Sequence, residues 1–262
     1  MSVPPANKRS GIIRQLIKRV THFVCSAGWR FKPDSLGKNE MTQQLRLYEG
    51  VMLLALNEVS GTMNGDYIDI TVAASGVADL LLMKRIATDS EGYVKVEDAS
   101  STDDWVLNRI LNKMASASKP RKLKYWVERL GNAGGMKHLV AKSLAEKGIV
   151  KAEEKTVLWL FTKRVYPEIN PDPENALRSA MRRAVFEPDA PVSEHTTLML
   201  ALAKSGGLLK QVFTTGELRQ HKARIQQVVE GQMIGKAAKQ AIEAIQMVVI
   251  MAAVIPTIVV TS

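Results

Sequence analysis

The sequence predicts a mainly α-helical domain with one or two small β-hairpins, preceded by an amphipathic N-terminal helix. Apolar residues recur at helical spacing through most of the chain after residue 41, and two short stretches alternate in the way strands do. A polar linker rich in Gly, Pro and Ser, CSAGWRFKPDSLGKNE, separates the N-terminal helix from the rest. We therefore expect two parts, a basic arm and linker over residues 1–40 and a compact helical domain over residues 41–262.

The stretch GIIRQLIKRVTHFV, residues 11–24, predicts a basic amphipathic helix, because its apolar residues cover one side and its cations the other. Residues 1–33 hold seven Lys or Arg and no acid, which leaves 29 of the 36 basic residues and all 26 acids for the remainder. Such a helix can bury its apolar side at an anionic membrane surface. A cleaved transit peptide, or a helix packed on the domain, fits the same pattern. The candidate membrane residues of this arm are Ile12, Ile13, Arg14, Leu16, Ile17, Lys18, Arg19, Val20 and Phe23.

Composition and cysteine use argue against several classes of protein. The apolar fraction of 46% and the charged fraction of 24% are those of an ordinary globular protein. Cys25 is the only cysteine, which excludes an internal disulfide, and the four histidines lack the spacing of metal ligands or of a catalytic triad. The apolar run over residues 247–260 is shorter than the roughly 20 residues of a membrane span. We expect no enzymatic activity, no cofactor and no metal.

Helical periodicity and end signals place the elements of the domain in order. Thr42 is the expected N-cap of the first helix, and Gly61 follows its last turn. Gly131 is expected to end a later helix, and Asp172 to cap one whose first residue is Pro173. A strand is expected over residues 92–96. The expected helices span residues 42–60, 73–87, 100–116, 122–131, 136–147, 173–186, 193–213, 218–231 and 237–254.

The segment EKTVLWLFTKRVYP, residues 154–167, predicts two short strands around a turn near Thr162 and Lys163. With the preceding helix it is similar in pattern to a winged helix, in which Lys163 and Arg164 would contact nucleic-acid phosphate. This nucleic-acid-binding alternative is less favoured, because the helix has an apolar packing face and Glu146 opposes phosphate. In the other interpretation the hairpin is buried on one or both faces. Val157, Trp159 and Phe161 alternate there with Leu158 and Leu160.

A glycine-rich stretch, GNAGGMK, directly precedes the helix expected over residues 136–147. Glycines before a helix expose backbone N–H groups, and the helix dipole adds favourable potential for an anion. No Ser or Thr follows the lysine, so the stretch is not the phosphate-loop consensus. A plain glycine-rich helix start is the alternative. The candidate anion-binding residues are Gly134, Gly135, Lys137 and His138.

An ordered set of segments resembles the Golgi phosphoprotein 3 family, also called the GPP34 domain. LRLYEGVMLLALNEVSGTM is similar to the family's opening helix, and AASGVADLLLMKRI is similar to its second helix. YWVERL and LVAKSLAEKGIVKAEEKTVLWLFTKRVYPEINP resemble a further helix, a glycine turn and the β-hairpin. TTLMLALAKSGGLLKQVF and HKARIQQVVEGQMIGKAAKQAIEAIQMVVIMAAV resemble the C-terminal helices. The resemblance covers about residues 43–260, and the loops and hairpin look closer to the family's bacterial members.

The resemblance implies a compact helical domain that binds membranes peripherally. Eukaryotic members recognise phosphatidylinositol 4-phosphate at the Golgi and retain glycosyltransferases there through their cytosolic tails, and their hairpin is implicated in self-association. Their lipid pocket uses a tryptophan and three arginines. The corresponding positions are Asn64, Ala73, Gly134 and Lys137, so only Lys137 keeps a positive charge. Under the resemblance, the glycine-rich helix start would bind a lipid headgroup, and the hairpin would serve self-association or membrane contact.

The sequence is therefore interpreted as that of a peripheral membrane protein that binds anionic phospholipid, with phosphatidylinositol 4-phosphate as the headgroup the resemblance implies. It would act as an adaptor or retention factor for membrane-protein cargo. The implied partners are the membrane, a cargo similar to a glycosyltransferase tail and, through the hairpin, a second copy of the chain. The expected location is the cytoplasm, peripheral on a membrane, which in a eukaryote is the Golgi; organelle targeting by the arm is the alternative.

Overall fold

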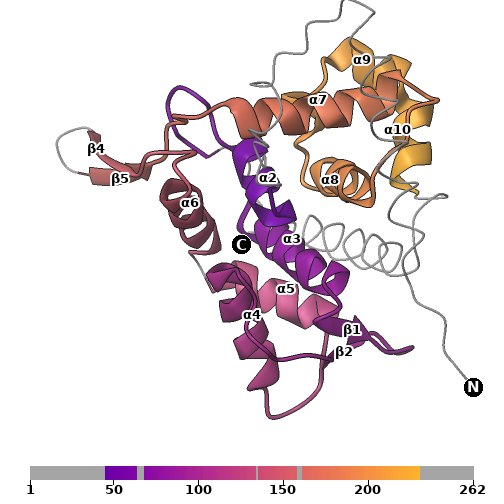
Figure 1. Cartoon of the computed structure of the whole chain (residues 1–262). Helices are drawn as coiled ribbons and strands as arrows, with labels where there is room; N and C mark the ends of the chain where they lie inside the picture. The colour runs from indigo at the N-terminus through magenta and orange to yellow at the C-terminus, as the bar shows by residue number, and fades with distance from the viewer. Residues whose placement is uncertain (1–44, 64–67, 134, 158–160, 231–262) are drawn as a thin grey trace, which may run out of the picture. The chain divides into compact units, whose positions relative to one another are not determined.

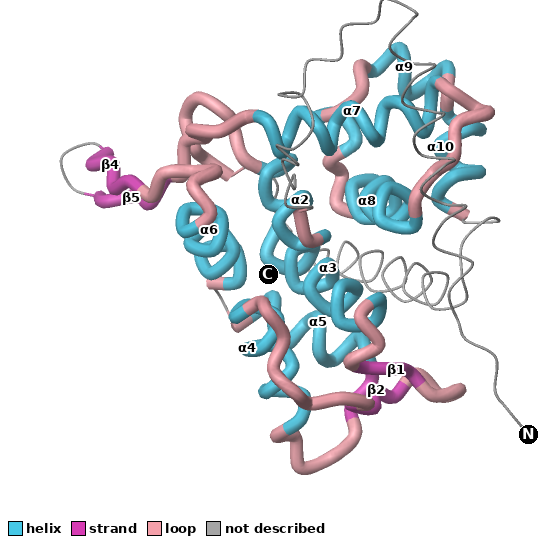
Figure 2. The backbone as a smooth tube through the Cα atoms, in the orientation of Figure 1, coloured by secondary structure: helices cyan, strands magenta, loops and turns pink. Residues whose placement is uncertain are grey.

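A computed structural model describes residues 45–63, 68–133, 135–157 and 161–230, which belong to one compact unit (Figure 1). The arm, the predicted domain boundary near residue 40 and the helix expected over residues 237–254 lie outside these ranges. Within them the fold is mainly α, as the sequence predicts. Nine α-helices, one short 3₁₀ helix and two small antiparallel sheets make up the described unit (Figure 2).

Most elements of the chain are helices, and two short β-hairpins lie between them, one after α3 and one after α6. The helices are α2 (Leu47–Ala55), α3 (Ile68–Leu82), α4 (Trp105–Ala115), α5 (Leu123–Asn132), α6 (Met136–Glu146), α7 (Asp172–Phe186), α8 (Glu194–Ser205), η2 (Leu209–Gln211), α9 (Thr215–Gln220) and α10 (Lys222–Val229). The strands are β1 (Ile86–Thr88), β2 (Tyr93–Val96), β3 (Arg121–Lys122), β4 (Glu153–Val157) and β5 (Phe161–Val165).

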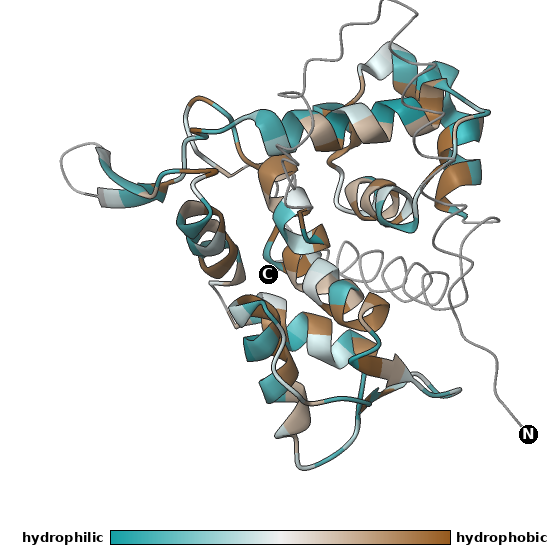
Figure 3. Ribbon diagram, viewed as in Figure 1, coloured by the Kyte–Doolittle hydropathy of each residue, from teal (hydrophilic) through white to brown (hydrophobic). Residues whose placement is uncertain are grey.

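Two central helices form the core of the unit. Every residue of α2 is buried, and α3 is buried over most of its length. Such helices show no single apolar face, because neighbouring elements cover them all round. α2 packs against α3, α6, α7 and α8, while α3 also contacts α4 and α5. In Figure 3 apolar residues gather on α2 and α3, whereas hydrophilic residues predominate on the hairpin of β4 and β5.

Several helix boundaries differ from the prediction. α3 begins at Ile68 rather than Ala73, because burial outweighs the low helix propensity of the β-branched residues in its first turns. The basic pair predicted to end that helix lies in the turn after it, where Lys84 has a left-handed φ of 54°. The helix predicted over residues 218–231 is divided at His221 into α9 and α10.

Two other end signals have a different meaning from the one predicted. Gly131 does not end α5, which continues through it. A Cβ at Gly131 would lie 2.9 Å from the Cα of Ile70, so glycine here allows α5 to pass close to α3. Asp172 is the first residue of α7 rather than its cap, and Pro171 takes the N-cap position. α2 is shorter than predicted and ends at Ala55.

The two sheets are small and antiparallel. In the first, β2 is the predicted strand and pairs on one side with β1, where Ile86 faces Val96. On its other side β2 pairs with β3. Neither β1 nor β3 was predicted, because a strand of two or three residues is too short to show an alternating pattern. In the second, Thr156 faces Thr162, so the turn predicted near Thr162 and Lys163 is wrong, and both residues lie in β5. The side chains at 154–156 and 162–164 are exposed, whereas the side chains at 157–161, for which burial was predicted, lie outside the described part of the chain.

Candidate functional site

The residues predicted to bind an anion lie at the N-terminus of α6. Gly135 is the N-cap and has a φ of 93°, a conformation that favours glycine. The backbone N–H of Lys137 donates to Oδ1 of Asp69 at 3.1 Å, and the Lys137 ammonium lies 3.0 Å from Oδ2. Asp69, from the first turn of α3, therefore takes a position that an external anion would otherwise occupy. Gly134 lies outside the described residues.

His138 forms a second contact at this site. Its Nδ1 lies 2.8 Å from the hydroxyl of Tyr166, within hydrogen-bond distance. Burial lowers the pKa of His138, and the nearby positive charges of Lys137 and Arg164 lower it further. The fold thus gathers Lys137 and His138 from α6, Asp69 from α3 and Arg164 from β5, a set that we call the α6 cluster.

The hairpin of β4 and β5 carries a pair of like charges. Lys155 and Lys163 lie directly opposite each other, and both side chains are exposed. Like charges in this position destabilise a sheet by about 0.2–1 kcal/mol. Among the described residues neither lysine has an ion-pair partner. Arg164 lies 3.7 Å from Glu154, but both side chains are about two-thirds exposed and the pair contributes little.

The apolar end of this hairpin lies partly outside the described residues. The last described backbone pair joins Val157 to Phe161, and the predicted contact residues Leu158 and Trp159 fall in the undescribed connection. In Figure 1 the hairpin extends away from the helices. The structure therefore exposes the basic part of the hairpin, and the contribution of its apolar residues stays a prediction.

The winged-helix alternative finds little support in the position of α6. This helix packs against α2, α3 and α4, with Val140 and Leu144 fully buried. Its exposed side carries Lys142 and Glu146, whose charged groups are 3.8 Å apart. The indole N–H of Trp105 also donates to Glu146 at 2.9 Å. A helix with this balance of charge lacks the cationic face that binds nucleic-acid phosphate.

A buried polar network, which the sequence does not predict, joins the start of α2 to its neighbours. The hydroxyl of Tyr48 donates to Asp104 at 2.6 Å, and Lys147 lies 2.6 Å from the fully buried Glu49. Asp79 of α3 accepts hydrogen bonds from two backbone N–H groups of the first turn of α2. Burial raises the pKa of Asp79 to about 7 and, with the charge of Glu49, raises the pKa of Tyr48. These contacts stabilise the helix arrangement, because buried charges need partners.

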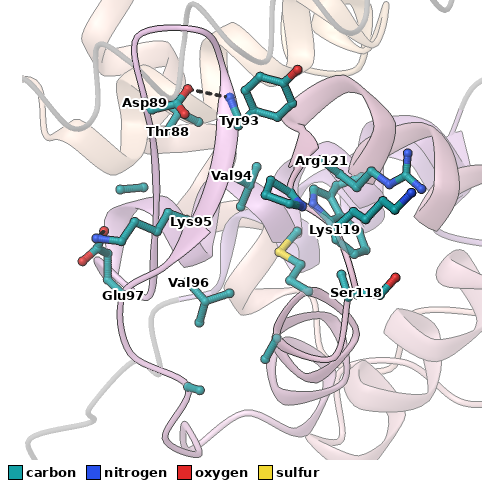
Figure 4. Close-up of a pocket in the computed structure, with 17 residues that line it drawn as sticks. Thr88, Asp89, Tyr93, Val94, Lys95, Val96, Glu97, Ser118, Lys119 and Arg121 are labelled. Carbon is teal, nitrogen blue, oxygen red and sulfur yellow. Dashed lines mark hydrogen bonds and ion pairs between the residues drawn. The ribbon is translucent and has the colours of Figure 1, made fainter.

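A cavity beside the first sheet was also not predicted. It has a volume of about 770 Å³ and lies between the first sheet, the C-terminal end of α4 and the start of α5 (Figure 4). Its apolar lining includes Val94, Val96 and Met114. The charged residues that line it are Asp89, Lys95, Glu97, Lys119 and Arg121. Sequence reasoning missed it because the cavity depends on the two strands that were not predicted.

The described ranges show neither a metal-binding group nor a membrane-spanning helix. In the described ranges no group of three or more His, Cys, Asp or Glu is arranged to hold a metal ion. No described helix has both the length and the hydropathy needed to cross a bilayer.

The chain is a compact, mainly α-helical domain with a projecting basic hairpin, and comparison with known families identifies its family. The sequence model of the family described as Golgi phosphoprotein 3 (GPP34) matches residues 47–245. This chain therefore belongs to the Golgi phosphoprotein 3 family, whose members are Golgi-associated and peripheral and which is not known as an enzyme family. Comparison with individual curated proteins gives no match.

Proposed function

We propose that this chain is a peripheral membrane protein that binds anionic phospholipid through the β4–β5 hairpin and the α6 cluster, and that it retains membrane-protein cargo at that surface. The observation that carries the proposal is the exposed cross-strand pair of Lys155 and Lys163. At an anionic surface each nearby Lys or Arg contributes about 1 kcal/mol. This gain exceeds the about 0.2–1 kcal/mol that the repulsion costs the isolated hairpin.

The sequence between the two lysines supports the same surface. The stretch VLWLF, residues 157–161, is wholly apolar, and apolar residues beside cations are typical of segments that enter the headgroup region. The α6 cluster, near the base of the hairpin, adds Lys137 and Arg164. We propose that these groups receive the headgroup phosphate of an anionic lipid.

Asp69 limits how selective this site is. Its carboxylate already binds both the backbone N–H and the ammonium of Lys137, so a headgroup phosphate meets a negative charge there. We therefore expect binding to follow the negative charge of the membrane. Phosphatidylinositol 4-phosphate would be favoured for its charge more than for its shape.

Vesicle sedimentation tests the proposal with the full-length chain. The vesicles contain phosphatidylcholine alone, or with phosphatidylserine, or with phosphatidylinositol 4-phosphate. Wild-type protein should sediment with both anionic vesicles at low salt, and Lys155→Glu combined with Lys163→Glu should reduce the bound fraction several-fold. The matched control reverses two exposed cations elsewhere, Lys210→Glu and Lys222→Glu. Equal binding by the two double variants, or none by the wild type, would refute the proposed surface.

The N-terminal arm needs its own experiment, because its membrane residues lie outside the described ranges. Deleting residues 1–33 removes seven cations and is expected to weaken binding to every anionic vesicle alike. Self-association through the hairpin is tested separately by analytical ultracentrifugation of Trp159→Ser. If the hairpin joins two copies, this variant sediments as a smaller species than the wild type.

A further inference from the structure

We infer that copies of this chain bind each other head to tail, with an exposed apolar turn of one copy bound in a cationic pocket of the next. The turn carries Val59, with Ile169 on the segment beside it, and the pocket lies between α4 and the start of α6. In Figure 1 the turn after α2 lies at the upper left and α4 at the bottom, with α6 between them, so one copy cannot fill its own pocket. This contact is separate from the hairpin and goes beyond the proposed membrane role.

A tight turn after α2 holds an apolar side chain in solvent. Val59 is 87% exposed, and a backbone hydrogen bond of 2.8 Å closes the turn over residues 57–61. The backbone N–H of Glu168 donates to the carbonyl of Glu58 at 3.3 Å, which ties the turn to the segment before α7. On that segment Ile169 is 58% exposed. Apolar groups held in place in this way lose little conformational freedom when they bind a partner.

The two segments that carry these apolar side chains are acidic. Arg178 of α7 pairs with Glu58 at 3.1 Å and with Glu174. One guanidinium does not balance all the acids of the two segments, so the surface around Val59 keeps a net negative charge. Residues 57–61 and 166–174 hold no Lys or Arg and four acids, which are Glu58, Glu168, Asp172 and Glu174.

The pocket beside α4 is lined by apolar residues and two cations. Its volume of about 120 Å³ suits a single side chain, since pockets for drug-sized ligands measure about 300–1,000 Å³. Arg109 and Lys113 lie one turn apart on α4, both are exposed, and neither belongs to an ion pair among the described residues. Like charges at this spacing weaken a helix unless a partner compensates them. The other residues that line the pocket are Val106, Ile110, Leu130, Ala133, Met136 and Leu139.

The turn and the pocket are complementary in shape and charge. Val59 or Ile169 would contact the apolar lining, and the acids beside them would lie near the two cations of α4. Lys137, at the start of α6, is already neutralised by Asp69 at 3.0 Å, so the α4 cations are the ones left for a partner's acids. Because turn and pocket are different surfaces of one chain, the contact is heterologous, and each added copy offers a further turn or pocket.

Sedimentation equilibrium of the full-length chain measures this association. A contact centred on one or two side chains is weak, so the concentration is raised from micromolar towards millimolar. We expect the mean mass to rise above the 28.9 kDa of one chain, and to fall back towards it in high salt, because salt screens the exposed charges. The same series in Trp159→Ser excludes association through the hairpin.

Two double variants remove the two sides of the contact. The turn variant is Val59→Lys with Ile169→Lys, and the pocket variant is Arg109→Glu with Lys113→Glu; all four positions are exposed. Each variant alone should remain a single chain at concentrations at which the parent associates. Mixed in equal amounts, the two should form a complex of two chains, because the turn variant keeps its pocket and the pocket variant keeps its turn.

Matched controls keep the chemistry of the turn or move the charge reversal elsewhere. Val59→Leu with Ile169→Leu leaves the turn apolar, and Lys210→Glu with Lys222→Glu reverses two exposed cations outside the pocket. Both should associate as the parent does. Thermal unfolding of every variant shows that the fold is retained.

Three results would overturn the inference. The Trp159→Ser chain stays single at every concentration; or the turn and pocket variants associate as the parent does; or the parent associates while the two variants do not combine when mixed. The membrane proposal fails separately, because Lys155→Glu with Lys163→Glu should lose vesicles and keep the association. Association without any vesicle binding would remove the membrane role and leave this contact in place.

Discussion

Replacing Lys147 by Met should destabilise the protein strongly, because it leaves Glu49 as an unpaired charge in the core. The Glu49 side chain is fully buried, and that of Lys147 is 23% exposed with its ammonium 2.6 Å away. Removing one partner of a buried ion pair costs about 3–5 kcal/mol. Two donors remain, the backbone N–H of Arg46 at 3.1 Å and the hydroxyl of Ser143 at 3.4 Å. We therefore expect a loss near the lower limit, about 3 kcal/mol.

Urea unfolding followed by circular dichroism measures this loss, with an unchanged dependence on denaturant as the sign that only stability has changed. Lys147→Met combined with Glu49→Gln should recover most of the loss, because the buried charge is gone. The control is Lys142→Met on the same helix, whose 3.8 Å pair with Glu146 is exposed and contributes less than about 0.5 kcal/mol. Glu49 does not depend on Lys147 if Lys147→Met costs no more than Lys142→Met, or if the double variant is no more stable than Lys147→Met alone.

Two further predictions concern the backbone and pH. Gly61→Ala should lower the free energy of unfolding by more than about 2 kcal/mol, because φ is 63° and a Cβ would lie 2.2 Å from the backbone nitrogen of Pro167. Gly92→Ala, where φ is 81° and no atom lies within 4 Å of the added Cβ, should lower it by about 1 kcal/mol. Thermal unfolding measures both losses. Equal losses would contradict the steric account. Burial raises the pKa of both Asp79 and Glu168 to about 7, with Glu174 and Glu58 adding to the shift of Glu168. The folded chain then holds extra protons between about pH 4 and pH 7, so the free energy of unfolding should fall as pH rises through that window. Asp79→Asn and Glu168→Gln should each flatten this dependence, and an unchanged slope in both variants would refute it.

The elements with strong local signals were predicted well from the sequence. α8 begins after its side-chain cap Ser193, at the start of the helix expected over residues 193–213, and ends at Ser205. α4 begins at Trp105, within the helix expected over residues 100–116, and Asp104 is its side-chain cap rather than an acid of its first turn. The mainly α fold and the family follow from the same ordered pattern, which the family match confirms over residues 47–245. Local patterning is sufficient for α4 because its buried residues lie on one face, and side-chain caps mark where α4 and α8 begin.

The candidate site was only partly predictable. Gly135 and Lys137 lie at a helix start, as the glycine-rich stretch indicates, but Asp69 lies far away in the sequence and its contact with Lys137 depends on how α3 meets α6. Nothing in the periodicity of either segment indicates that a carboxylate fills this position. The hairpin register, which brings Lys155 opposite Lys163, was likewise missed because the turn was placed within β5.

By itself, the sequence determined the helical class, the uneven distribution of charge, the basic hairpin and the family. Tertiary structure alone decided that Gly131 is a crossing point rather than a helix end, that Glu49 and Lys147 form a buried pair, and that β2 lies between β1 and β3 beside a cavity. The physical reason is the distance along the chain over which each signal acts. Periodicity and capping act within a few turns of chain, whereas partners, crossings and cavities arise between segments whose meeting depends on the packing of the whole core.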